Sequence, residues 1–66
     1  MIRKILRLPQ VEEATGESRS TIYLRIKQGK FPRPVKLGAK SVGWPEDEIA
    51  AYNEVRIAER DGTEAA

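Results

Sequence analysis

The 66-residue sequence contains neither cysteine nor histidine. No disulfide can therefore stabilise the chain, and the usual ligands of a structural zinc site are missing. A chain of this length forms one domain and buries only about 60% of the surface that its unfolded form exposes. We expect a marginally stable domain that rests on a small apolar core, with no metal and no cofactor.

Long apolar runs are also missing. No stretch approaches the roughly 20 residues that cross a bilayer, and residues 1–4 are too short and too polar for a secretory signal. These features predict a soluble, cytoplasmic protein without a membrane partner.

The sequence shows no set of catalytic residues. Catalysis needs positioned acids, bases or nucleophiles in a water-excluding pocket, which so short a chain can hardly enclose. The hydroxyls at 18–21 have no candidate base nearby, and no glycine-rich phosphate loop is present. We therefore expect no enzymatic activity.

Charge is unevenly distributed along the chain, although the net charge is only +2. Residues 1–45 carry ten Lys and Arg against three acids, a net of +7, and residues 46–66 carry two against seven, a net of −5. The first two-thirds can meet a polyanion, which the last third would repel. Solvated charge on every face of a small domain is the alternative interpretation.

Two short helices are expected in the first half of the chain. Residues 5–8 are apolar and can be extended, and a helix from about Pro9 to Thr15 would turn three side chains inward: Leu8, Val11 and Ala14. Gly16 suits the left-handed end of this helix. Ser18 suits the N-cap of a second helix that runs to about Gln28.

The second helix buries Ile22 and Ile26, which lie one turn apart, and Gly29 ends it. Residues 31–34 must then be extended because they contain two prolines. Two short strands follow around a hairpin loop at 38–41, and four side chains are expected to share the core face: Val35, Leu37, Val42 and Trp44.

Pro45 opens the last helix, and the acids at 46–48 suit the positive end of its dipole. Its inner side is predicted to hold Ile49, Tyr52 and either Val55 or Arg56. The pattern ends at Asp61 and Gly62, and residues 63–66 are expected to fray. We therefore expect a domain over residues 1–57 and a frayed helix end and tail over 58–66.

The predicted order of helix, three-residue turn, helix, hairpin and helix is typical of a winged helix-turn-helix, a mainly α fold with a small β-hairpin. In this fold the second helix enters the major groove of DNA. Base and phosphate contacts are expected from one set of its residues: Ser18, Arg19, Ser20, Thr21, Tyr23 and Lys27. The hairpin is the expected wing, with contacts from Lys36, Gly38, Lys40 and Ser41.

Two residues of the second helix have open roles. Leu24 lies on its outer face, where it could touch a thymine methyl or could tuck under the hairpin. Tyr23 could lie at the core edge or contact DNA.

The sequence resembles the AlpA family of prophage regulators, relatives of excisionases and of MerR-type DNA-binding domains. The resemblance covers roughly residues 3–57 and rests on four ordered blocks: Leu6-Arg7-Leu8-Pro9-Gln10-Val11, Thr15-Gly16-x-Ser18-Arg19-Ser20-Thr21-Ile22-Tyr23, Gly29-x-Phe31-Pro32-x-Pro34-Val35-Lys36-Leu37-Gly38, and Val42-Gly43-Trp44-Pro45 with Glu48-Ile49. It implies sequence-specific DNA binding, with a recognition helix at 18–27 and a wing at 38–41.

Three positions depart from the family pattern. Glu17 occupies a turn position that is usually apolar, so we expect weaker packing and an acid near the DNA-facing helix start. Lys40 replaces a frequent Arg, which makes a minor-groove contact less secure. Tyr52 replaces a frequent Trp and should matter only for packing.

The resemblance favours a transcriptional regulator of a prophage or mobile element that binds double-stranded DNA. An excisionase-like factor that bends DNA shares the fold and is the alternative, and a protein-interaction module that uses the acidic last helix is a third hypothesis. RNA polymerase or a recombinase is a further expected partner. One recognition helix reads few base pairs, so specificity is expected to need cooperative self-association on DNA.

Overall fold

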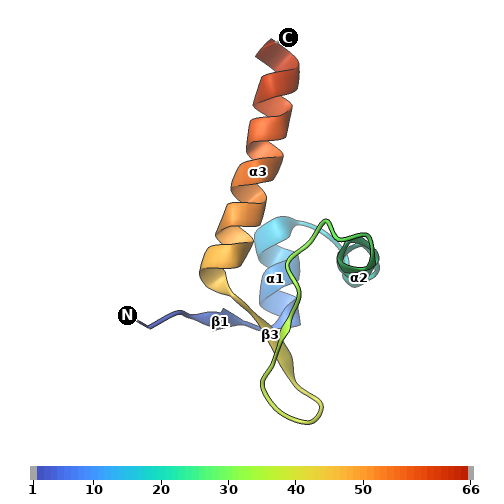
Figure 1. Cartoon of the computed structure of the whole chain (residues 1–66), viewed down its shortest axis with the longest axis vertical. Helices are drawn as coiled ribbons and strands as arrows, with labels where there is room; N and C mark the ends of the chain where they lie inside the picture. Colours follow the sequence, from blue (N-terminus) through green and yellow to red (C-terminus); the bar gives the residue numbers. More distant parts are fainter. Residues whose placement is uncertain (1, 66) are drawn as a thin grey trace.

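Three helices pack against a small antiparallel sheet in the part of the chain that the structure describes (Figure 1). The structure is a computed structural model that describes residues 2–65, with side chains described up to residue 62. The elements in order are β1 (Ile5–Leu6), α1 (Leu8–Thr15), α2 (Arg19–Lys27), β2 (Val35–Lys36), β3 (Val42–Pro45) and α3 (Glu46–Ala65). The strands lie in the order β1-β3-β2. This architecture confirms the winged helix-turn-helix fold.

The turn between α1 and α2 has three residues, as the sequence predicts. Gly16 adopts a left-handed conformation with φ 72°, and its N–H donates to the carbonyl oxygen of Glu12 at 2.8 Å. The N–H of Thr21 donates to the hydroxyl of Ser18 at 3.3 Å, so Ser18 is the N-cap of α2. These two signals place one helix end and one helix start only three residues apart.

The core lies between the sheet and the three helices. It contains seven buried side chains: Leu6, Val11, Ile22, Phe31, Trp44, Ile49 and Tyr52. Trp44 lies at its centre, fully buried, and its indole Nε1 donates to the carbonyl oxygen of Pro32 at 2.9 Å. Leu8 and Ile26 pack against this core as expected, but Ala14 is exposed and its predicted inward position is wrong.

The predicted core face of the hairpin is half wrong. Trp44 is buried and Val42 packs against the core, but Val35 and Leu37 are 45% and 46% exposed. The register explains this, because Val35 pairs with Gly43 and therefore lies on the opposite face of the sheet from Val42. On this outer face a Cβ added at Gly43 would lie 2.5 Å from Ile5 Cγ2 and 3.1 Å from Leu37 Cδ1.

Helix α3 extends beyond the rest of the molecule (Figure 1). Its first turns bury Ile49 and Tyr52, but Val55 is 56% exposed and Arg56 is exposed, so neither continues the inner side. The helix also continues through Gly62 to Ala65, past its predicted end. Residue 66, part of the expected tail, lies outside the described residues. Across the described chain no helix has both the length and the apolar character needed to cross a bilayer.

Candidate nucleic-acid interface

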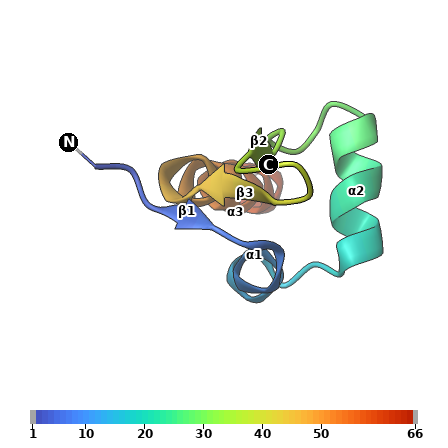
Figure 2. The same ribbon diagram turned by 90° about the horizontal axis from the view of Figure 1, so that it is seen from below.

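Helix α2 lies at the edge of the molecule, crosswise to α1 and α3 (Figures 1 and 2). Its inner side contains Ile22, which is fully buried, and Ile26, which packs against the core. The opposite side is open to solvent and contains Ser20, Leu24 and Lys27 along one line, with Arg19 and Tyr23 beside it. Among the described residues, neither the hairpin nor α3 covers this face.

The structure shows whether Tyr23 and Leu24 are buried or exposed. Tyr23 is 40% exposed and Leu24 is 54% exposed, so neither belongs to the core and Leu24 is not tucked under the hairpin. The guanidinium carbon of Arg19 lies 5.9 Å from the centre of the Tyr23 ring, within the range of a cation–π contact. The outer face of α2 therefore combines the exposed apolar side chain of Leu24 with cationic and hydroxyl groups.

Two of the predicted contact residues are occupied within the protein. The hydroxyls of Ser18 and Thr21 lie 3.0 Å apart in a mutual hydrogen bond, and Ser18 also caps the helix. Thr21 is half-buried, whereas Arg19, Ser20 and Lys27 are exposed. Four predicted contact residues of α2 therefore have side chains open to solvent: Arg19, Ser20, Tyr23 and Lys27.

The predicted wing lies at the end of the molecule opposite the tip of α3 (Figure 1). The N–H groups of Leu37 and Gly38 donate to the carbonyl oxygen of Ser41 at 2.8 and 3.3 Å and close the loop. Lys36, Gly38 and Lys40 are exposed, and Ser41 is half-buried. Lys36 lies on the same face of the sheet as its partner Val42, and its side chain is exposed.

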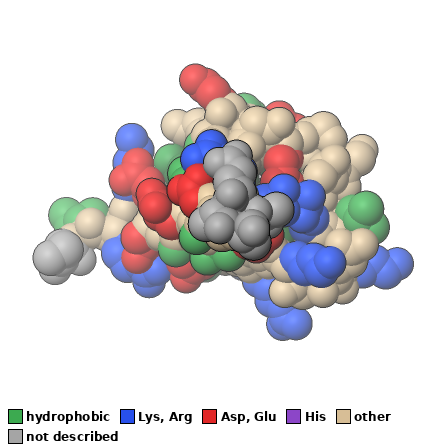
Figure 3. Space-filling view, turned by 90° about the horizontal axis from the view of Figure 1, so that it is seen from above, with side chains coloured by type: hydrophobic (Ala, Val, Ile, Leu, Met, Phe, Trp, Pro, Cys, Tyr) green, Lys and Arg blue, Asp and Glu red, His purple; other side chains and the backbone are tan. Residues whose placement is uncertain are grey.

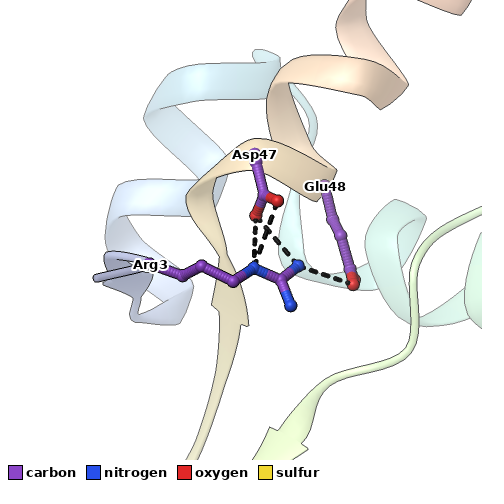
Figure 4. Close-up of polar contacts among 3 residues, drawn as sticks. All are labelled: Arg3, Asp47 and Glu48. Carbon is purple, nitrogen blue, oxygen red and sulfur yellow. Dashed lines mark hydrogen bonds and ion pairs between the residues drawn. The ribbon is translucent and has the colours of Figure 1, made fainter. Parts of the chain in front are cut away.

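Basic side chains gather on the α2 side of the molecule, and most acidic side chains lie around α3 (Figure 3). Near the N-terminus, Arg3 is paired with two acids of the last helix (Figure 4). Arg3 donates from Nε and Nη2 to Asp47 at 3.0–3.2 Å, and from Nη2 to Glu48 at 3.2 Å. The hydrogen bond from Arg3 lowers the pKa of Asp47 below its ordinary value. This cluster joins the segment before β1 to the first turn of α3.

A polar cluster behind α2 was missed by the sequence reasoning. Arg25 Nε lies 2.9 Å from Glu17 Oε1, and both atoms are buried in a close ion pair rather than an aligned hydrogen bond. Tyr52 donates its phenolic hydrogen to Glu17 Oε2 at 2.5 Å. Burial, and then the hydrogen bond to Glu17, raises the pKa of Tyr52.

The partners of Glu17 correct one part of the expectation for this residue. The carboxylate faces the protein and joins the turn to α2 and α3, so it does not meet the DNA-facing helix start as a free acid. A signal was present in the sequence, because Arg25 lies three residues after Ile22 and thus beside Ile26 on the inner side of the helix. A cation there needs a partner, and Glu17 is close in sequence.

A comparison with protein families identifies the chain. The model of the family described as "Prophage CP4-57 regulatory protein (AlpA)" matches residues 4–57. The chain belongs to the AlpA family. Membership is consistent with the resemblance carried by the sequence blocks and with the helix-turn-helix and wing seen in the structure.

The chain is also similar to two individual proteins. The chain is 47% identical over 57 residues to "Uncharacterized protein ORF88" of Enterobacteria phage P4, which covers 86% of this chain and 65% of that protein. It is 50% identical over 52 residues to "DNA-binding transcriptional activator AlpA" of Escherichia coli K12, covering 70% of this chain and 74% of that protein. The chain thus spans somewhat less than two-thirds of the phage P4 protein. No solved structure matches the chain.

Proposed function

We propose that this protein is a sequence-specific DNA-binding transcriptional regulator of a prophage or similar mobile element. The outer face of α2 enters the major groove, where Arg19 contacts a guanine and Ser20 and Lys27 contact base edges or phosphates. Such a regulator acts on bacterial DNA, so we propose a cytoplasmic location.

The observation that carries this proposal is the open outer face of α2. A helix laid in the major groove needs one side free of its own protein, and the described residues leave that side uncovered. The name of the Escherichia coli relative, a DNA-binding transcriptional activator, supports the same conclusion. The cations of the first two-thirds of the chain provide attraction to phosphates.

The hairpin loop supports a second contact. Lys40 is exposed at the tip of the loop, and Lys36 is exposed at its base. We propose that this wing follows the phosphates beside the groove that α2 occupies. Two contacts on one duplex fix the orientation of a small domain better than a single helix does.

Selection of binding sites from a library of random duplexes tests the proposal. We expect a short preferred sequence to be enriched and its affinity to fall steeply with salt, because several phosphates are neutralised. Failure to enrich any sequence would contradict the proposal and would favour the protein-interaction module.

The excisionase-like alternative gives a different outcome in a second measurement. A circular-permutation gel shift on the selected site, placed alone and as adjacent repeats, reports bending. For this protein we expect little bending on the single site. Strong bending at clustered repeats would favour the architectural role and a recombinase as partner.

A further inference from the structure

Helix α2 is attached to the body by few contacts. Ile22 is the one fully buried side chain among its nine residues, and Ile26 adds a partial contact. Two apolar contacts one turn apart lie close to a line along the helix. They hold the helix against the core but resist rotation about its own axis poorly. The helix-turn-helix needs a further contact to fix which face of α2 points outward.

Arg25 supplies a contact off this line. Its side chain is 26% exposed, and its Nε lies 2.9 Å from Oε1 of Glu17 in the turn, whose side chain is 15% exposed. Glu17 is itself held at three points, because its N–H donates to Thr15 Oγ1 at 3.3 Å and its second carboxylate oxygen accepts from Tyr52. Glu17 therefore contacts α1 through its backbone N–H, and its carboxylate links α2 to α3.

The pairing also changes the charge that α2 presents. Among its three basic residues, Arg19 and Lys27 are exposed, whereas Arg25 lies on the inner side with a buried Nε. Removing either member of a largely buried pair leaves the other charge uncompensated, which costs more than the pair itself contributes. The pair is therefore poorly suited to opening for a phosphate contact.

We propose that Glu17 and Arg25 are positioning residues: their ion pair, braced by Tyr52, sets the rotation of the recognition helix, and Arg25 makes no contact with DNA. The part of this inference that concerns DNA binding rests on the proposed function. It assigns base discrimination partly to residues that never touch a base.

A comparison of Arg25→Gln with Lys27→Gln tests whether Arg25 contacts DNA, because each variant removes one positive charge from α2. Lys27→Gln should lower the slope of log affinity against log salt by about one unit. Arg25→Gln should leave that slope unchanged. It should lower the ratio of affinities for selected and random duplexes by about tenfold, the discrimination carried by about one base pair. An equal fall in slope for both variants would show that Arg25 contacts phosphate and would overturn the proposal.

Glu17→Gln tests whether the ion pair sets the rotation of α2. It keeps an oxygen for Tyr52 but removes the charge that holds Arg25. Because it makes the protein more basic, a purely electrostatic role predicts tighter binding to every duplex. Positioning predicts that the ratio of affinities for selected and random duplexes falls. An unchanged ratio would contradict positioning. The double variant Glu17→Arg with Arg25→Glu, which exchanges the two charges, should recover part of the ratio that Glu17→Gln loses.

A measurement without DNA separates this proposal from the proposed function. Amide hydrogen exchange of the free protein should show faster exchange in α2 of Glu17→Gln, with α3 and β3 unchanged. Uniformly faster exchange would indicate general destabilisation, and unchanged exchange in α2 would show that the pair does not hold the helix. Either result overturns positioning even if the wild-type protein selects no DNA sequence.

Discussion

Gly43 is the position at which the packing of the sheet can be tested most sharply. An added Cβ would lie 2.5 Å from Ile5 Cγ2, 3.0 Å from the carbonyl oxygen of Leu6 and 3.1 Å from Leu37 Cδ1. The two side chains can rotate away, but the carbonyl belongs to β1, which pairs with β3 at Leu6 and Trp44. Gly43→Ala must therefore shift one strand against the other.

The expected cost follows from two opposing terms. Overpacking at a tightly enclosed position costs about 1–3 kcal/mol. Alanine gains about 0.5–1 kcal/mol over glycine in a strand through the lower entropy of its unfolded chain. The two ranges leave a net loss of about 0–2.5 kcal/mol, and the fixed carbonyl oxygen of Leu6 favours the upper half of this range. A domain of 66 residues has a total stability of roughly 3–10 kcal/mol, so this loss is a large fraction.

Urea denaturation followed by tryptophan fluorescence and far-UV circular dichroism measures this loss. Trp44 is the one tryptophan of the sequence and is fully buried, so its emission reports on unfolding. Gly38→Ala is the matched control, because nothing lies within 4 Å of an added Cβ there and its φ is not positive. Equal midpoints for the two variants would refute the reasoning about the β1–β3 contact.

Three further predictions concern the interface and its support. Leu24 should contact a thymine methyl, so replacing thymines by uracil one at a time in the selected duplex should weaken wild-type binding about fourfold at one position. Binding of Leu24→Ala should not change at that position, and wild-type binding that is unaffected by every uracil would exclude the contact. Lys40→Gln should lower the salt slope by about one unit on all duplexes if the wing contacts phosphate, and an unchanged slope would remove it from the interface. The raised pKa of Tyr52 means that its contribution to stability is complete below about pH 10 and is lost as pH rises further. Tyr52→Phe should therefore lose less stability between pH 9 and 11 in urea titrations, and parallel curves for the two proteins would contradict this.

The helix boundaries around the turn could be predicted because each depends on local chemistry. Gly16 supplies a left-handed φ, and Ser18 supplies a hydroxyl that caps the next helix. The open outer face of α2 followed from the spacing of Ile22 and Ile26 alone. These features need no knowledge of what the chain contacts elsewhere.

The errors arise where distant segments meet. The face on which Val35 lies depends on its pairing with Gly43, and that pairing is not written in the alternation of apolar residues. The prediction placed Val35 and Trp44 on one face, although a shift by one residue reverses the face of a strand. Either Val55 or Arg56 was expected on the inner side because the helical period continues, but α3 extends past the body that it packs against and both residues are exposed.

Glu17 shows a different kind of limit. The sequence suggested an acid in a place that usually holds an apolar residue, and the expected result was a weaker turn. The carboxylate is instead shared by Arg25 and Tyr52, which lie 8 and 35 residues further along the chain. The position of Arg25 on the inner side of α2 was a signal for its pairing with Glu17, but only the fold brings Tyr52 to the same carboxylate.

The central claim is that the exposed face of α2 reads bases, and Arg19 tests it most directly. The affinities of wild-type protein and Arg19→Ala should be measured on the selected duplex and on a random duplex at one salt concentration. We predict that Arg19→Ala loses about 1–3 kcal/mol on the selected duplex and much less on the random one, with relaxed base choice at one position. An equal loss on both duplexes, or no loss on either, would contradict the account.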